Sequence, residues 1–168
     1  MGAAMNVLII DDYKSYGESL VSMIRVLGHE AQYAPSYTEA EWLLDLFPFQ
    51  LALLDFDMPV MTGPTIAEKL TKRFPAIRPV IMSARPPDGS RREEIGDWTF
   101  LQKPLTRTVL QELLNHLAIE KTGVRLMIRP SFEIVRTTPD HKSAGETSDG
   151  RGESGTKDEG ETEAPRTP

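Results

Sequence analysis

The chain has 168 residues, of which 39% are hydrophobic, and this suffices for one domain of ordinary size with some chain to spare. Its 17 acidic and 15 basic residues within 1–136, followed by 8 acidic and 4 basic residues, leave no basic surface, so we expect no direct nucleic-acid binding. The absence of cysteine excludes disulfides and thiolate metal sites.

No segment has the pattern of a membrane anchor. The longest apolar run without a charge, residues 46–54, is far shorter than the roughly 20 residues that span a bilayer. The N-terminus lacks the basic stretch and long apolar region of a signal peptide. We therefore expect a cytoplasmic protein without membrane insertion.

The first half of the chain alternates between strand and helix patterns. Residues 5–10 form a short apolar run that ends abruptly at Asp11-Asp12, which predicts a buried parallel strand. Apolar residues then recur at helical spacing over 20–27, and Gly28 follows as a C-terminal cap. A brief strand over 30–34 leads to a second helix.

The second helix begins with a capping box, in which Ser36 is the N-cap and Glu39 lies three residues on. The pattern predicts a helix that continues to Leu46. The most hydrophobic strand of the chain, residues 50–54, follows and runs directly into Asp55.

The second half repeats the alternation. A turn-rich segment precedes a helix over 65–73, and strand 79–82 ends at Ser83. Strand 100–102 ends at Lys103-Pro104, and 105–117 form a final amphipathic helix. The segment between the last two strands holds several Pro and Gly residues and lacks apolar periodicity, so we expect a short or irregular fourth helix.

Five strands that alternate with helices predict an α/β fold with a parallel sheet. Ligands of such sheets bind beyond the carboxyl ends of the strands. The polar residues at these ends are therefore the candidate site residues: Asp11, Asp12, Asp55, Ser83 and Lys103.

This set of side chains suits phosphoryl transfer. Carboxylate oxygens are the ligands that Mg²⁺ prefers, and an ionised aspartate is a nucleophile without any general base. Lys103 would neutralise charge on the transferring oxygens, and Ser83 would donate a hydrogen bond to one of them. A solvated strand end explains Asp11-Asp12 equally well when it is considered alone.

Four motifs resemble those of response-regulator receiver domains, the family of the bacterial chemotaxis regulator. They are LIIDD, LALLDFDMPVMTG, VIMSA and FLQKP, and the resemblance covers residues 5–118. It implies a flavodoxin-like, doubly wound five-stranded sheet of order 2-1-3-4-5 with helices on both faces.

The resemblance also implies a role for each residue. Asp55 would be the phosphoacceptor, and Mg²⁺ would be held by Asp55, by the acidic pair Asp11 and Asp12, and by the backbone carbonyl of Asp57. Lys103 would contact the phosphoryl group, with a cis peptide bond to Pro104. Ser83 would be the switch hydroxyl and Phe100 the switch aromatic, although a strand phenylalanine also packs in a core for its own sake.

The implied function is a phosphoryl-accepting switch of a two-component system or phosphorelay. A sensor histidine kinase or phosphotransfer protein would donate the phosphoryl group, and the chain would signal by protein–protein interaction. It would be no enzyme beyond catalysing its own phosphorylation and dephosphorylation. Because no second globular domain is apparent, we expect a stand-alone receiver.

Two other functions stay open at this stage. A pseudo-receiver would keep the fold as a binding module without being phosphorylated. LLDFDMPV also resembles the nucleophile motif of haloacid-dehalogenase-type phosphatases, with Asp55 as nucleophile and Asp57 as acid/base. Those enzymes need an acidic metal pair after the lysine, whereas Asp11 and Asp12 precede Lys103.

We predict three regions in the chain. Residues 5–120 would form the receiver domain, and 121–136 an extension with possible short β segments. Residues 137–168 have no aromatic and almost no aliphatic side chains, which predicts a disordered acidic tail.

Overall fold

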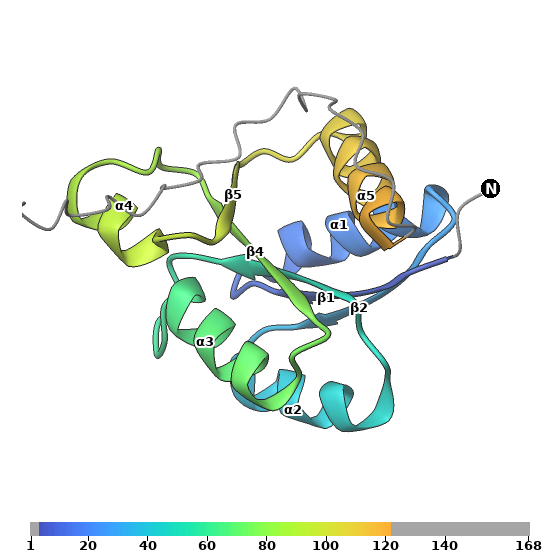
Figure 1. Ribbon diagram of the computed structural model, residues 1–168, viewed down its shortest axis with the longest axis horizontal. Coiled ribbons are helices and arrows are strands. Elements are labelled where there is room, and N and C mark those ends of the chain that lie inside the picture. The colour runs from blue at the N-terminus through green and yellow to red at the C-terminus, as the bar shows by residue number, and fades with distance from the viewer. Residues whose placement is uncertain (1–3, 122–168) are drawn as a thin grey trace, which may run out of the picture. The chain divides into compact units, whose positions relative to one another are not determined.

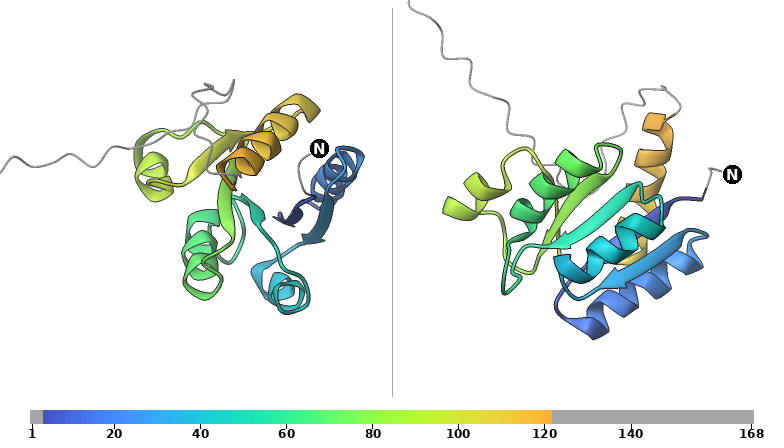
Figure 2. Two further views of the ribbon diagram at one scale, coloured as in Figure 1. Left: turned by 45° about the vertical axis from the view of Figure 1, so that its right-hand side comes forward. Right: turned by 90° about the horizontal axis from the view of Figure 1, so that it is seen from below.

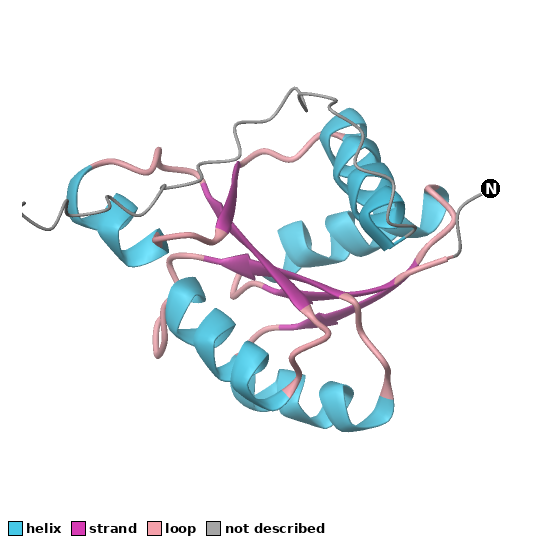
Figure 3. Ribbon diagram, in the orientation of Figure 1, coloured by secondary structure: helices cyan, strands magenta, loops and turns pink. Residues whose placement is uncertain are grey.

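The structure is a computed structural model and describes residues 4–121. Strands and helices alternate along the chain (Figures 1 and 3). The strands are β1 (Asn6–Ile10), β2 (Glu30–Ala34), β3 (Leu51–Asp55), β4 (Arg78–Ser83) and β5 (Thr99–Gln102). The helices are α1 (Lys14–Val26), α2 (Tyr37–Leu46), α3 (Gly63–Arg73), α4 (Gly89–Ile95) and α5 (Arg107–Lys121).

The five strands form one sheet in the order β2-β1-β3-β4-β5, and every neighbouring pair is parallel. This confirms the predicted fold class. The central strand β3 is buried along its whole length, as expected of a strand covered on both faces. The register pairs Ile10 of β1 with Leu54 of β3, so the two strands end side by side.

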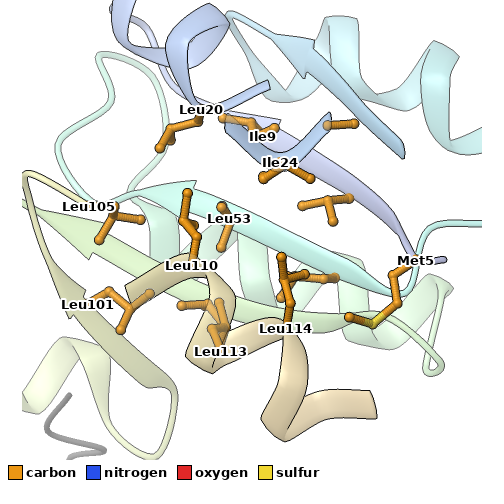
Figure 4. Packing of buried hydrophobic residues seen from close by; sticks show 14 of the residues in the cluster. Met5, Ile9, Leu20, Ile24, Leu53, Leu101, Leu105, Leu110, Leu113 and Leu114 are labelled. Atoms are coloured by element: carbon orange, nitrogen blue, oxygen red, sulfur yellow. The ribbon is translucent and has the colours of Figure 1, made fainter. Parts of the chain in front are cut away.

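Alternate residues of each strand enter two separate cores. Val7, Ile9 and Leu53 lie in the core between the sheet and helices α1 and α5, whose packing Figure 4 shows. Leu8 and Leu54 point to the opposite face and pack with residues of α2 and α3. The ribbon views place α1 and α5 on one face of the sheet and α2 and α3 on the other (Figures 1 and 2).

The predicted signals for the first two helices act as expected. Gly28 has φ 86°, a left-handed conformation that glycine adopts without strain just beyond the end of a helix. The Ser36 hydroxyl accepts a hydrogen bond from the Glu39 backbone N–H at 3.2 Å. This contact satisfies one of the backbone donors that the first turn of a helix leaves unpaired.

Two predicted helix starts were wrong. The third helix begins at Gly63 rather than Thr65, because proline is tolerated in the first turn of a helix and Pro64 occupies that turn. The last helix begins at Arg107 rather than Leu105, because the Thr106 hydroxyl accepts a hydrogen bond from the Val109 N–H at 3.3 Å and caps the helix there.

Helix α4 is short, as predicted. It has seven residues, and Ile95 is its buried residue. The helix ends at Ile95 and is capped by Gly96, whose φ of 53° is unfavourable for residues with a side chain. A helix with so little buried apolar surface needs other contacts to hold it against the sheet.

Within residues 4–121, no helix is long and apolar enough to cross a membrane. The predicted extension over 121–136 lies outside the described residues except for Lys121, the last residue of α5. The predicted acidic tail over 137–168 lies wholly outside them.

Candidate functional site

The candidate residues lie at the carboxyl ends of four strands. Asp11 follows β1, Asp55 is the last residue of β3, Ser83 is the last residue of β4, and Lys103 follows β5. Because these strands are parallel, their carboxyl ends meet at one edge of the sheet. The structure divides the candidates between two neighbouring groups, one acidic and one that contains arginine.

The acidic cluster consists of Asp11, Asp12 and Asp55. One carboxylate oxygen from each residue lies within 4.8 Å of the other two. Asp11 is fully buried, Asp55 is 6% exposed, and Asp12 faces solvent. Three hard oxygen donors with one open side fit Mg²⁺, which usually keeps several waters and binds few protein carboxylates.

Local contacts hold Asp11 in place. Its Oδ1 accepts a hydrogen bond from the Tyr13 N–H at 2.9 Å, a short-range turn that aspartate forms readily. The Tyr33 hydroxyl donates to the Asp11 carbonyl at 2.9 Å. The side chain of Asp11 is thereby fixed toward the cluster before any ligand binds.

Burial raises the pKa of Asp55 above its usual value. The charges of Asp11 and Asp12 act in the same direction, whereas the hydrogen bond and charge of Lys103 only partly offset them. An additional positive charge in the acidic cluster would favour the ionised form of Asp55. The electrostatics of the site therefore favour binding of a cation.

Lys103 bridges two members of the acidic cluster. Its Nζ lies 2.6 Å from Asp11 Oδ2 and 2.9 Å from Asp55 Oδ1. Burial alone would lower the pKa of Lys103, but the hydrogen bonds and the charges of Asp11 and Asp55 together outweigh it and raise the pKa. The peptide bond from Lys103 to Pro104 is cis, as the sequence resemblance implied.

Ser83 and Asp57 lie in the second group. The buried Ser83 hydroxyl donates to Asp57 Oδ2 at 3.2 Å. Arg91 of α4 contacts both residues, and Arg85 Nη2 lies 3.0 Å from Asp57 Oδ1. The hydrogen bond from Arg91 is the main reason why the pKa of Asp57 lies below its usual value. The role of the Asp57 backbone carbonyl as a metal ligand stays a prediction.

Phe100 is buried, with 5% of its surface exposed. It lies in the same core cluster as Ile95 of α4 and Phe56, the residue after Asp55. This position suits an ordinary core residue. Its role as a switch stays a prediction.

Two residues near the site were not singled out from the sequence. Tyr16 of α1 has its ring 4.7 Å from Lys103 Nζ, and its hydroxyl accepts a hydrogen bond from the Leu105 N–H at 3.0 Å. Arg91 belongs to a run of charged residues, 91–94, in the segment between the last two strands. A signal for it existed, because the aliphatic Ile95 directly follows that run and residues four apart share a helix face.

The chain is similar to known proteins in both sequence and structure. A model of the family "response regulator receiver domain" matches residues 7–115. The sensor protein TorS of Escherichia coli is 29% identical over 115 residues, which is 67% of this chain and 13% of TorS. The chain thus spans only a small part of that relative.

Solved receiver domains have a similar fold. A CheY-like receiver domain protein from Methanospirillum hungatei has a TM-score of 0.64 at 22% identity, and the match covers 72% of this chain and 98% of that one. The chemotaxis protein CheY4 of Vibrio cholerae has a TM-score of 0.62 at 22% identity, covering 68% of this chain and 99% of that one. At these identities the likeness concerns the fold.

Proposed function

The chain belongs to the response regulator receiver domain family, and from this membership we propose that it is a signalling switch phosphorylated on Asp55. The observation that carries the proposal is the pairing of Asp55 Oδ1 with Lys103 Nζ at 2.9 Å beside two further carboxylates. This arrangement combines a nucleophilic oxygen, a fixed positive charge and a set of metal ligands in one place.

The proposed reaction transfers a phosphoryl group from a histidine nitrogen to a carboxylate oxygen of Asp55. A carboxylate oxygen of Asp55 attacks the phosphorus of a phosphohistidine, a P–O bond forms, and the P–N bond breaks with its electron pair leaving on the imidazole. Lys103 is already held at the nucleophile, so its ammonium is positioned to neutralise charge on the phosphoryl oxygens. The product is an acyl phosphate.

Mg²⁺ is the proposed cofactor. Asp11, Asp12 and Asp55 would hold it, with the Asp57 backbone carbonyl as a further ligand. When bound, it would offset the negative charge of the cluster and of the phosphoryl oxygens. No catalysis beyond the chain's own phosphorylation and dephosphorylation is proposed, because receiver domains act as switches.

The proposed donor is a sensor histidine kinase or a phosphotransfer protein. Similarity to a segment of the sensor protein TorS supports a place in two-component signalling. We also propose the predicted division into a receiver domain over 5–120 and an extension beyond it, since both core clusters and the site lie in the described part. The output would be a protein–protein interaction in the cytoplasm.

A gel assay tests the proposal. The purified chain is incubated with acetyl phosphate and Mg²⁺ and then run on a phosphate-affinity gel. We expect retarded migration that is lost with EDTA and in Asp55→Asn. Asp45→Asn is the matched control, because Asp45 is an exposed aspartate of α2 that pairs with Arg73, and its migration should shift normally.

One observation favours the pseudo-receiver as the second candidate. The Ser83 hydroxyl is engaged with Asp57 rather than free to meet a phosphoryl group. Absence of a gel shift, together with absence of Mg²⁺-dependent binding of beryllofluoride, would establish that alternative. Steady hydrolysis of a small phosphate ester would instead support the phosphatase alternative.

A further inference from the structure

Arg91 reaches from α4 into the group beside the phosphorylation site. Its side chain is only 13% exposed, and its guanidinium carbon lies 3.9 Å from the centre of the Phe56 ring. Nη2 contacts Asp57 Oδ1 at 2.5 Å, and Nη1 contacts Asp57 Oδ2 at 3.1 Å. A two-pronged pair of this kind is among the stronger polar contacts in proteins.

The guanidinium of Arg91 also donates a hydrogen bond to the Ser83 hydroxyl. A serine hydroxyl has one proton to donate and two lone pairs to accept with. Ser83 Oγ donates its proton to Asp57 Oδ2 at 3.2 Å and accepts from Arg91 Nη1 at 3.0 Å and from the Arg85 N–H at 3.1 Å. These three bonds use the full hydrogen-bonding capacity of Ser83. We name Arg91, Asp57 and Ser83 the Arg91 clamp.

Ser83 must give up one of these bonds to serve a phosphoryl group. It has a single proton, and Asp57 currently accepts it. Arg91 strengthens this arrangement, because its two terminal nitrogens contact both oxygens of the Asp57 carboxylate and hold that carboxylate in position. A phosphoryl oxygen on Asp55 would have to compete with Asp57 for that proton.

We propose that Arg91 is a positioning residue that holds the Ser83 hydroxyl on Asp57 and thereby opposes occupation of Asp55 by a phosphoryl group. The inference rests on the proposed phosphorylation of Asp55. Occupation of the site turns the hydrogen bond of the Ser83 hydroxyl from Asp57 to a phosphoryl oxygen and loosens the hold of Arg91 on Asp57.

The loosening is transmitted to α4. This helix has one buried residue, Ile95. Arg91 connects the helix to the ends of β3 and β4, through the Phe56 ring and through hydrogen bonds with Asp57 and Ser83. When Arg91 is released, the helix keeps Ile95 as its buried residue but loses its ion pair with Asp57. The state of Asp55 is thus read out as the mobility of residues 89–95.

The test uses the full chain, Mg²⁺ and beryllofluoride as the phosphoryl mimic, with affinity measured by isothermal titration calorimetry. In Arg91→Ala we expect about tenfold tighter binding, which corresponds to about 1.4 kcal/mol. In a Ser83→Ala background the same substitution should have no effect, because the competing proton is gone. Arg92→Ala is the matched control: it removes an exposed arginine from the next position of α4, and the affinity should not change.

Arg91→Lys covers the case in which Arg91→Ala does not fold. It keeps the positive charge but lacks the planar fork, so it should also bind more tightly than the unmutated chain. Unchanged or weaker binding in the folded Arg91 variants overturns the proposal, and weaker binding that persists without Ser83 means that Arg91 contacts the phosphoryl group itself. If neither the unmutated chain nor the Arg91 variants bind beryllofluoride, the proposed function fails and the inference with it.

Hydrogen exchange supplies an independent readout. In the unmutated chain, beryllofluoride should increase exchange in residues 89–95, and in Arg91→Ala exchange there should be high without it. Binding that leaves this exchange unchanged in the unmutated chain contradicts the release of α4 while leaving phosphorylation of Asp55 intact.

Discussion

Asp55 lies in an environment that opposes its own charge. It is nearly buried, two carboxylates lie beside it, and Lys103 offsets only part of their effect. The raised pKa means that the folded chain binds the Asp55 proton more tightly than the unfolded chain does. Ionisation of Asp55 in the folded state therefore costs stability when no metal is present.

Asp55→Asn should stabilise the chain in EDTA. Because the folded pKa of Asp55 is raised, its contribution is fully favourable below its unfolded pKa and is lost as pH rises through the folded value. Asparagine does not titrate, so the variant's advantage in melting temperature should grow from acidic to neutral pH. Differential scanning calorimetry between pH 4 and 7 measures it, and an advantage that shrinks with rising pH would contradict the electrostatic account.

Addition of Mg²⁺ should make the unmutated chain more stable than Asp55→Asn. A ligand at a hundredfold excess over its dissociation constant stabilises the folded state by about 2.7 kcal/mol. The unmutated chain should gain this stability, and Asp55→Asn, which lacks one carboxylate of the acidic cluster, should gain less.

Tyr16 is expected to support the position of Lys103. Tyr16→Phe keeps the ring beside Lys103 but removes the acceptor for the Leu105 N–H. A part-buried donor left without a partner costs about 1–3 kcal/mol, which urea denaturation would measure. Tyr13→Phe is the control, because Tyr13 is 69% exposed and its hydroxyl should matter little. Equal stability of both variants would refute a structural role of the Tyr16 hydroxyl.

At the scale of elements, the connection from β3 to α3 sets the position of Asp55. Gly63 opens α3 directly against the end of β3, and its N–H donates to the Phe56 carbonyl at 3.2 Å. A Cβ on Gly63 would come within 2.6 Å of the Asp55 carbonyl oxygen, so backbone would have to move. The glycine is needed for this close approach.

Gly63→Ala should destabilise the chain by about 1–3 kcal/mol and weaken Mg²⁺ binding, because the shift occurs at Asp55 itself. Gly28→Ala is the control. It should also destabilise the chain, because φ is 86° there. Nothing lies within 4 Å of the added carbon, however, and Gly28 precedes β2, at the edge of the sheet opposite to the acidic cluster. An Mg²⁺ titration followed by calorimetry distinguishes the two variants. Equal Mg²⁺ affinity in both would contradict the claim that the close approach of Gly63 sets the position of Asp55.

Helix α4 shows how a polar segment is held on a fold. Its composition predicted a short helix, and this was confirmed. What the composition did not indicate is that an arginine supplies the second anchor, through the Phe56 ring and Asp57. Pro and Gly residues restrict where the helix forms, but only the neighbouring strand ends determine what it contacts.

For the whole molecule, the two cores and the site lie within one part of the chain. Within the described part of the chain, the core residues of both clusters run from Met5 to Leu117. A variant that ends at Lys121 should therefore unfold cooperatively, with a free energy of unfolding within about 0.5 kcal/mol of that of the full chain. It should keep its Mg²⁺-dependent gel shift. A non-cooperative melt of the shortened chain would mean that residues beyond 121 belong to the fold.

Much of the fold could be predicted because its signals are local. A strand buried on both faces is a short apolar run, and polar residues at its end mark the loop beyond. Asp11, Asp55 and Lys103 each follow or end such a run, and parallel strands bring their carboxyl ends to one edge. The acidic cluster therefore follows from sequence pattern and sheet geometry together, although its role in phosphorylation stays a proposal.

The order of elements, the parallel sheet and the composition of the strand-end site could all be inferred from the amino-acid sequence. Which side chains pair with one another at the site became known from the packed fold. Lys103 meets Asp11 across 92 residues and Arg91 meets Asp57 across 34, and no local pattern encodes either choice. The reason is physical: secondary structure depends on neighbours in the chain, whereas an ion pair depends on which side chains the packed layers bring within hydrogen-bonding distance, and that is known only when the layers are in place.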